Sequence, residues 1–286
     1  MKETPVVVSE RRAAVLGKPI AHSLSPVIHN AGYVAAGLTG WSYTRIECAA
    51  AELPALVAGL GPEWAGLSVT MPGKEAALTV AAEVSPVAVA VGAANTLVRR
   101  PDGSWYADNT DVTGIVEVLT EAGVRPGANV ALLGAGGTAR AALAAAAQLG
   151  AGTVTVIARR PAAVADLEPV AAVLGVAMSS AAWPGTPHAQ VSALTGVDVL
   201  ISTVPKGAAD EFVGLLPWQA ATVVFDALYD PWPTPLAAAA GAAGCRIVSG
   251  LDLLLAQAIG QFEQFTGVPA PRPAMAAALS AARSFP

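Results

Sequence analysis

Hydrophobic and polar positions along the first 111 residues follow a pattern that predicts strands alternating with helices. The apolar runs RAAVLG at 12–17 and WAGLSVTM at 64–71 have the length of buried strands. Between them, SPVIHNAGYVAAGL at 25–38 carries apolar residues at helical spacing. Ser25 followed by Pro26 is typical of a helix start, with the serine as N-cap and the proline at the first helical position. The pattern indicates an α/β unit whose sheet is mostly parallel.

The rest of this first unit is predicted in the same way. We expect a strand at 41–48, helices at 50–60, 74–83 and 86–92, and two short strands at 95–100 and 104–108. The two short strands are joined by Pro-Asp-Gly, which places proline and glycine where turns favour them.

A second unit starts near residue 112 with a predicted helix, VTGIVEVLTEAG. Its strands are short and apolar, as in a sheet buried on both faces: 125–134, 153–158, 198–204, 221–228 and 245–249. Strands of this kind alternating with helices indicate a doubly wound sheet. No strand separates the last two predicted helices, 251–267 and 273–284. We therefore expect an α/β protein with one domain at 1–111, a second at 112–249, and helices at 250–286 that return to the first domain.

Composition narrows the class of protein. The 286 residues are 54% hydrophobic and only 13% charged, which fits a globular chain of two domains and excludes a disordered one. The longest weakly polar stretch, 141–160, is interrupted by Gln148 and Gly150, so we expect no membrane span. A net charge of −5 argues against a nucleic-acid partner.

Two further absences bear on location and metals. We see no signal peptide, and Cys48 and Cys245 lie too far apart for a metal motif, so we expect reduced cysteines in a cytoplasmic protein. His22 and His29 are seven residues apart with no carboxylate at ligand spacing. We therefore predict no metal site and expect the histidines to serve packing or hydrogen bonding.

A glycine-rich turn, Gly134 to Ala139 (GAGGTA), follows the strand NVALL and opens a helix, which matches G-x-G-x-x-G/A in its required context. Its glycines let the backbone approach a pyrophosphate, and the helix N-terminus favours an anion. The alternative is a tight turn without a ligand.

The strand that follows this turn and its helix indicates which cofactor binds. It ends in Ala158-Arg159-Arg160, with no carboxylate for a ribose 2′-hydroxyl, and Asp166 is expected inside the next helix. Two guanidiniums suit a 2′-phosphate, so we predict NADP(H), unless both arginines are only solvated surface charges.

Polar clusters also follow several strands: GKPIAHSLSPVIHN at 17–30, SVTMPGK at 68–74, Asn95-Thr96 and DNTD at 108–111. Open α/β sheets bind ligands at the carboxyl ends of their strands. Further motifs follow in the same order: G-A-x-N-T at 92–96, N-T-D-x-x-G at 109–114, the glycine loop, Y-x-P-x-x-T-P at 229–235 and the helix of Gln257. With these motifs in this order, the chain resembles the shikimate dehydrogenase family along nearly its whole length.

This resemblance implies an enzyme that reduces 3-dehydroshikimate to shikimate with NADPH, in aromatic amino-acid biosynthesis. It makes the first domain the substrate domain and the second a Rossmann-type NADP domain. Lys74 and Asp111 correspond to the family's catalytic pair. A carbonyl that accepts hydride becomes an alkoxide, which a proton-donating cation stabilises, and a carboxylate favours the charged lysine.

The same resemblance implies the binding residues. Ser23 and Ser25 would bind the substrate carboxylate, Thr70, Asn95 and Gln257 its hydroxyls, and Tyr229 would support the substrate. The implied cofactor residues are Gly134, Ala135, Gly136, Gly137, Thr138, Ala139, Arg159, Arg160 and Gly250. Without the family, Lys74 is equally well explained as a solvated residue in a helix's first turn and Asp111 as a helix cap.

Some positions depart from the family's usual pattern. Ser68 stands where Asn is common, Ala158 where an N-R-T run often begins, and Ala227 where a methionine often backs the nicotinamide. STVPKG at 202–207 replaces a more usual N-A-[TS]-x-x-G. The alternatives are a dehydrogenase acting on quinate or using NAD, a non-catalytic NADP-binding sensor, and a folate dehydrogenase of similar layout. We expect a small-molecule substrate and a monomer or homodimer, with no nucleic-acid or membrane partner.

Overall fold

The computed structural model describes residues 10–183 and 194–283. Contacts between Cα atoms divide the chain into two compact units. The first comprises 1–89, 93–110 and 258–286, and the second comprises 90–92 and 111–257. The long helix α10 (Gly250–Thr266) therefore contributes its first part to the second unit and its remainder to the first.

The first unit is built on a six-stranded sheet in the order β2-β1-β3-β5-β6-β4. The strands are β1 (Arg11–Gly17), β2 (Trp41–Glu47), β3 (Trp64–Val69), β4 (Glu83–Val84), β5 (Thr96–Arg99) and β6 (Trp105–Asp108). β2 and β3 run parallel to β1, and β4 runs parallel to β6. β5 is antiparallel to both β3 and β6, and a tight turn joins β5 to β6 as a hairpin. Three of the five described pairings are parallel, so the prediction of a mostly parallel sheet is confirmed.

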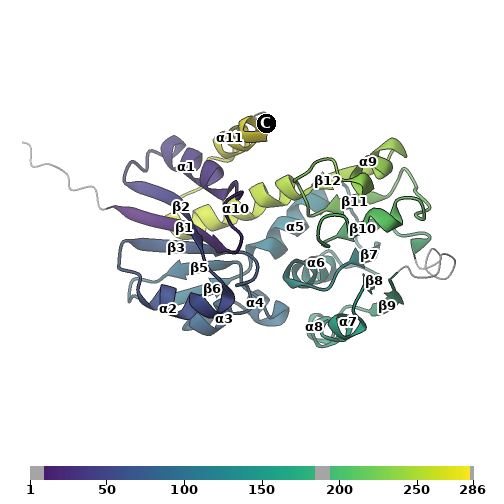
Figure 1. Ribbon diagram of the computed structural model, residues 1–286, viewed down its shortest axis with the longest axis horizontal. Helices are drawn as coiled ribbons and strands as arrows, with labels where there is room; N and C mark the ends of the chain where they lie inside the picture. The colour runs from purple at the N-terminus through teal and green to yellow at the C-terminus, as the bar shows by residue number, and fades with distance from the viewer. Residues whose placement is uncertain (1–9, 184–193, 284–286) are drawn as a thin grey trace, which may run out of the picture. The chain divides into compact units, whose positions relative to one another are not determined.

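Helices complete the first unit (Figure 1). They are α1 (Ser25–Ala35), α2 (Leu53–Ala58) after a 3-10 turn (Ala50–Glu52), α3 (Ala77–Val80), the first part of α4 (Pro86–Val91), α11 (Arg272–Arg283) and the second part of α10. α1 and α11 pack against each other. The predicted helix at 74–83 was too long. The chain leaves α3 after Val80 because the Ala82 N–H donates to Trp105 O at 2.9 Å and β4 then pairs with β6.

Glycine allows α10 to approach the first sheet closely. A Cβ on Gly66 of β3 would lie 2.0 Å from the Phe265 ring, which is buried. The ring centroids of Phe262 and Phe265 on this helix lie 6.4 and 6.0 Å from the ring centroid of His29. The C-terminal part of α10 is therefore a component of the core of the first unit.

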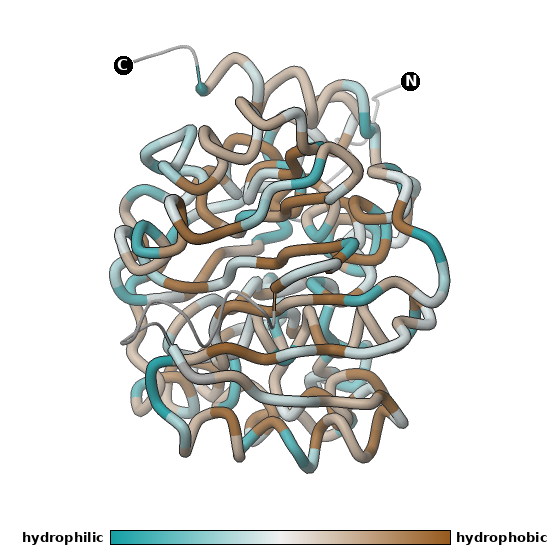
Figure 2. Tube along the Cα trace, turned by 90° about the vertical axis from the view of Figure 1, so that its right-hand side faces the viewer, coloured by the Kyte–Doolittle hydropathy of each residue, from teal (hydrophilic) through white to brown (hydrophobic). Residues whose placement is uncertain are grey.

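The second unit has a six-stranded sheet in the order β12-β11-β10-β7-β8-β9, and every pairing is parallel. Its strands are β7 (Asn129–Leu133), β8 (Thr153–Ala158), β9 (Met178–Ala182), β10 (Val199–Ser202), β11 (Val223–Asp226) and β12 (Arg246–Ser249). The strands read as largely hydrophobic runs bordered by polar turns (Figure 2). The predicted doubly wound sheet is confirmed.

The helices of the second unit are α5 (Thr110–Glu121), α6 (Gly137–Gln148), α7 (Pro161–Ala165), α8 (Glu168–Leu174), α9 (Pro235–Ala242) and the first part of α10, with a 3-10 turn at Asp210–Phe212. Asp166 was predicted inside a helix, and this was wrong. The predicted helix is divided into α7 and α8, and Asp166 lies between them as the C-cap of α7.

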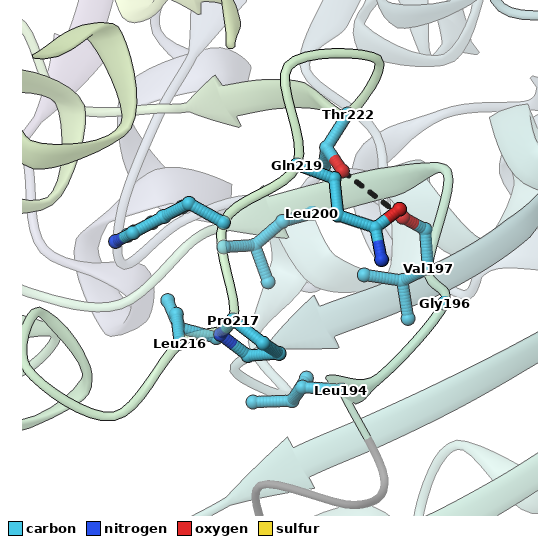
Figure 3. A pocket seen from close by; sticks show the side chains of 9 residues that line it. Leu194, Gly196, Val197, Leu200, Leu216, Pro217, Gln219 and Thr222 are labelled. Atoms are coloured by element: carbon cyan, nitrogen blue, oxygen red, sulfur yellow. Dashed lines mark hydrogen bonds between the residues drawn. The ribbon is translucent and has the colours of Figure 1, made fainter. Parts of the chain in front are cut away.

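A small apolar cavity lies in the second unit (Figure 3). Its volume is about 10 Å³, and its lining includes Leu194, Leu200 and Pro217. On its rim, Thr222 Oγ1 donates a hydrogen bond to Val197 O at 3.2 Å. A space of this size holds no more than a water molecule, so the cavity is a packing feature and not a ligand site.

None of the described helices is long and apolar enough to cross a bilayer.

Candidate active site

The carboxyl ends of β1 and β3 meet at one edge of the first sheet. The Thr70 N–H donates to Leu16 O at 2.8 Å, and the Lys18 N–H donates to Met71 O at 3.1 Å. Gly17 lies between them, where a Cβ would come within 2.4 Å of Thr70 Cγ2. The loop after β1 and the segment after β3 are therefore held together by backbone contacts.

Lys74 and Asn95 belong to the same edge. The Val69 N–H donates to Asn95 O at 2.7 Å, and the Ala94 N–H donates to Lys74 O at 2.8 Å. Asn95 is buried, whereas Thr70 and Lys74 are half-buried. The structure thus brings three of the predicted residues, Thr70, Lys74 and Asn95, onto neighbouring segments of the first unit.

The side-chain amide of Asn95 has a fixed orientation. Its Oδ1 accepts hydrogen bonds from the Thr110 N–H at 2.8 Å and from Thr96 Oγ1 at 2.8 Å. Because a backbone N–H can only donate, this pairing identifies which amide atom is the oxygen. The Nδ2 group consequently faces away from these threonines and acts as a donor.

Ser23 and Ser25 lie together at the start of α1. The helix begins at Ser25, so its N-cap is Leu24 and the prediction of Ser25 as N-cap was wrong by one residue. Leu24 already has helical backbone angles, and the Ser25 N–H donates to Ser23 Oγ at 3.3 Å. The two hydroxyl oxygens are 3.3 Å apart. Arg45 Nε fixes this loop by donating to Ser23 O at 2.8 Å.

His29 is a packing residue of α1. Its ring is fully buried and stacks on Tyr43 with centroids 4.1 Å apart and an angle of 7°. Burial lowers the pKa of His29 to about 3, an effect that the nearby Gln261 side chain opposes only in part, so the imidazole is neutral. His22, in contrast, is exposed. In the described ranges no group of three or more His, Cys, Asp or Glu side chains is arranged to hold a metal ion.

The glycine loop of the second unit has an enclosed start and an open middle. Gly134 has φ +109°, and a Cβ there would lie 2.4 Å from Thr203 Oγ1. Both the N–H and the hydroxyl of Thr203 donate to Leu133 O at 2.9 Å, so the 202–207 segment packs directly on the loop. Gly136 is the N-cap of α6, and a Cβ there would meet nothing within 4 Å. This open backbone before a twelve-residue helix fits a pyrophosphate.

Arg159 and Arg160 follow β8 and are both exposed. The Arg159 guanidinium lies 6.0 Å from the centroid of the Trp183 ring. Asp166 is also exposed but lies after α7, so it does not follow β8 directly. The basic end of β8 therefore matches the predicted preference for a 2′-phosphate over a free 2′-hydroxyl.

The other predicted residues of the second unit are partly or fully buried. Asp111 lies in the first turn of α5 and is 6% exposed, and Gln257 donates through Nε2 to Leu254 O at 2.8 Å. Tyr229 is half-buried in the loop after β11. Gly250 was predicted to bind the cofactor, and it has a packing reason of its own because a Cβ there would lie 2.1 Å from Ala227 O.

Comparison with known proteins agrees with these motifs. The family model described as shikimate dehydrogenase substrate binding domain matches residues 15–97, and the one described as shikimate 5'-dehydrogenase C-terminal domain matches residues 250–279. The chain is 40% identical over 275 residues to the protein named shikimate dehydrogenase (NADP(+)) from Methylobacterium radiotolerans, covering 93% of this chain and 94% of that one.

The chain belongs to the shikimate dehydrogenase family. Solved structures of members superpose on it. The Mycobacterium tuberculosis shikimate dehydrogenase is 51% identical, with a TM-score of 0.87 over 95% of this chain and 99% of that one. The Thermus thermophilus enzyme, solved in complex with NADP(H) and shikimate, is 29% identical, with a TM-score of 0.81 over 95% and 99% of the two chains.

The sequence motifs of the shikimate dehydrogenase family did not single out Gln261. Gln261 donates through Nε2 to Asn95 O at 3.0 Å and to Thr96 Oγ1 at 3.1 Å, and its Oε1 accepts from Ser68 Oγ at 2.6 Å. Ser68 in turn accepts from the Tyr43 hydroxyl at 2.5 Å. Gln261 supports Asn95, and its position four residues after Gln257 on one helix was the available signal.

Proposed function

We propose that this protein catalyses the NADPH-dependent, reversible reduction of 3-dehydroshikimate to shikimate. The observation that carries the proposal is the 40% identity, along almost the whole of both chains, to a protein named shikimate dehydrogenase (NADP(+)). The clustering of Thr70, Lys74 and Asn95 on one edge of the first sheet supports it, because those are the residues that the family motifs single out.

Binding of the substrate draws on residues of matching chemistry. The adjacent hydroxyls of Ser23 and Ser25 donate to the carboxylate of the substrate, which is an anion. Asn95 donates through Nδ2 to a ring hydroxyl, since its Oδ1 is already occupied by Thr110 and Thr96. Thr70, Gln257 and Tyr229 complete the proposed set.

Lys74 and Asp111 carry the proton chemistry in this proposal. When bound, the nicotinamide supplies the hydride that reduces the carbonyl carbon. The ammonium of Lys74 stabilises the negative charge on the oxygen and gives it a proton, which yields the hydroxyl of shikimate. Asp111 is the acidic member of this proposed catalytic pair, as the family motif implies.

The cofactor is held by the second unit. The proposed pyrophosphate site is the backbone of Gly134, Ala135, Gly136, Gly137, Thr138 and Ala139, of which Gly136 offers open space. Arg159 and Arg160 pair with the 2′-phosphate, because a guanidinium matches a phosphate through two parallel hydrogen bonds. Gly250 serves this site indirectly by admitting the close approach of Ala227.

We also propose that the protein works in the cytoplasm as a monomer or homodimer. Cys48 and Cys245 are free and buried, and burial raises the pKa of both thiols, so neither is poised to react. Sedimentation analysis of the purified chain distinguishes the two assembly states.

The decisive experiment is the oxidation of shikimate by the purified protein with NADP⁺, followed by the absorbance of the NADPH formed. The same assay is run with NAD⁺ in place of NADP⁺ and with quinate in place of shikimate. We expect kcat/KM to be highest for shikimate with NADP⁺. A higher value with quinate or NAD⁺ would reassign the enzyme to one of the alternatives, and binding of NADP⁺ without turnover would identify a sensor.

A further inference from the structure

The loop between β11 and α9, residues 227–233, carries Tyr229 and is held at its start by β10 and by the first residue of α10. The Ala227 N–H donates to Ser202 O at 2.8 Å, and the Gly250 N–H donates to Leu228 O at 3.2 Å. Gly250 can approach this closely only because it has no Cβ. Two backbone contacts therefore fix the two residues that precede Tyr229.

A buried carboxylate closes the same loop. Asp226, the last residue of β11, is 1% exposed. Its Oδ1 accepts from the Leu228 N–H at 3.2 Å, and its Oδ2 accepts from Thr234 Oγ1 at 2.6 Å. One carboxylate thus bonds a residue at the start of the loop and the residue that directly follows the loop.

Thr234 connects this carboxylate to α9. It is the N-cap of α9, and its Oγ1 accepts from the Ala237 N–H at 3.1 Å. The distance of 2.6 Å to Asp226 is that of a charge-assisted hydrogen bond between a hydroxyl and a carboxylate. The hydroxyl of Thr234 therefore joins the loop to both of the elements that flank it.

The carboxylate at position 226 is unfavourable for the fold by itself. Burial raises the pKa of Asp226, which means that the fold places the charged form there at a cost. Both partners, the Leu228 N–H and the Thr234 hydroxyl, are donors that an acceptor-only group satisfies. The arrangement fits a loop that must keep one conformation.

We propose that Asp226 and Thr234 are positioning residues that hold Tyr229 in the conformation that supports the substrate. The proposal rests on the proposed function, because it takes the role of Tyr229 from there. It predicts that loss of the Asp226–Thr234 hydrogen bond weakens shikimate binding, and that it does so only when the Tyr229 hydroxyl is present.

The test compares Thr234→Val with Thr234→Ser in the full-length enzyme. Valine keeps the branched shape but lacks the hydroxyl, so we expect the KM for shikimate to rise about 3- to 10-fold, as for the loss of one intramolecular hydrogen bond. Serine keeps the hydroxyl and should retain the wild-type KM. Asp226→Asn, which is isosteric, should raise KM like Thr234→Val and provides the test if the valine variant does not fold.

The chain offers a matched control and a coupling measurement. Thr222→Val removes a buried hydroxyl that bonds Val197 O in the same unit but away from the loop, and it should leave KM unchanged (Figure 3). In a Tyr229→Phe background, Thr234→Val should raise KM no further. Multiplicative losses in the double variant, or a wild-type KM in Thr234→Val, would overturn the proposal. Inactivity of the wild type would instead refute the proposed function.

Discussion

Single side chains of the first unit are oriented by contacts that leave one polar end available. Asn95 is the clearest instance, because two threonines occupy its oxygen and Gln261 supports its backbone. Arg45 fixes the backbone of the loop that carries Ser23 by donating to Ser23 O. Preorganisation of this kind lowers the cost of ordering a site when its ligand binds.

Lys74→Ala tests the catalytic assignment. We expect kcat for shikimate oxidation to fall on the order of 10²-fold or more, because the lysine charge matters most when the alkoxide forms. The KM for shikimate should change little. Lys18→Ala is the control, since Lys18 lies on the neighbouring segment and pairs with Glu47 at 3.5 Å. A steep rise in KM at unchanged kcat would make Lys74 a binding residue.

Arg159→Ala tests the choice of cofactor. Loss of a charge-assisted contact with the 2′-phosphate should raise the KM for NADP⁺ roughly 10- to 100-fold. The KM for NAD⁺ should hardly change, because NAD⁺ has no such phosphate. Arg160→Ala is the matched comparison and should have a smaller effect. Both cofactors are measured at one ionic strength, and equal losses for the two would show that Arg159 supports the loop instead of reading the phosphate.

At the scale of helices and strands, the apolar runs predicted the buried strands well. They did not predict the edge strand β9 or the short length of α3. β9 (MSSAA) has no hydrophobic alternation, and it forms because β8 offers it a parallel partner. α3 ends at Val80 because the next residues form backbone hydrogen bonds with the edge of the sheet, beginning with the Ala82 N–H to Trp105 O. Both outcomes are set by tertiary pairing, which no local pattern in the sequence contains.

Gly66→Ala tests how closely α10 packs on β3. The new Cβ would lie 2.0 Å from the Phe265 ring, a contact that neither the strand nor the buried ring can accept without moving. We expect a loss of about 1–3 kcal/mol in the free energy of unfolding, measured by urea denaturation. Gly59→Ala is the matched control, because its Cβ would make only ordinary contacts, at 3.5 Å or more. Equal stability of the two variants would contradict the packing described here.

At the scale of the whole chain, the candidate residues could be named from motifs, but their supporting network could not. Ser68 and Gln261 are 193 residues apart and share a hydrogen bond, and Asn95 and Gln261 are 166 apart. Such partners come together only when α10 returns to the first sheet. The role of Asp226 was not predicted for a related reason. Its hydrogen bond with Thr234 forms only because the loop between the two residues folds back on itself.

The stability of the whole molecule should depend on the protonation of one buried histidine. In the folded state the pKa of His29 is about 3, whereas in the unfolded chain it returns to 6.5. Between these two values the unfolded chain binds a proton that the folded one does not. Acidification through this range therefore favours unfolding, by about 1.4 kcal/mol for each pH unit below 6.5.

His29→Phe tests this linkage, because phenylalanine retains an aromatic ring against Tyr43 but cannot titrate. Urea denaturation at pH 7.5 and pH 5 gives the free energy of unfolding of each variant at each pH. The decrease on acidification should be smaller in His29→Phe than in wild type by about 2 kcal/mol. His22→Gln, which changes an exposed histidine, should keep the wild-type decrease. A decrease that is the same in His29→Phe and wild type would mean that His29 is protonated in the fold, and the neutral stacked ring would then be the wrong description of this core.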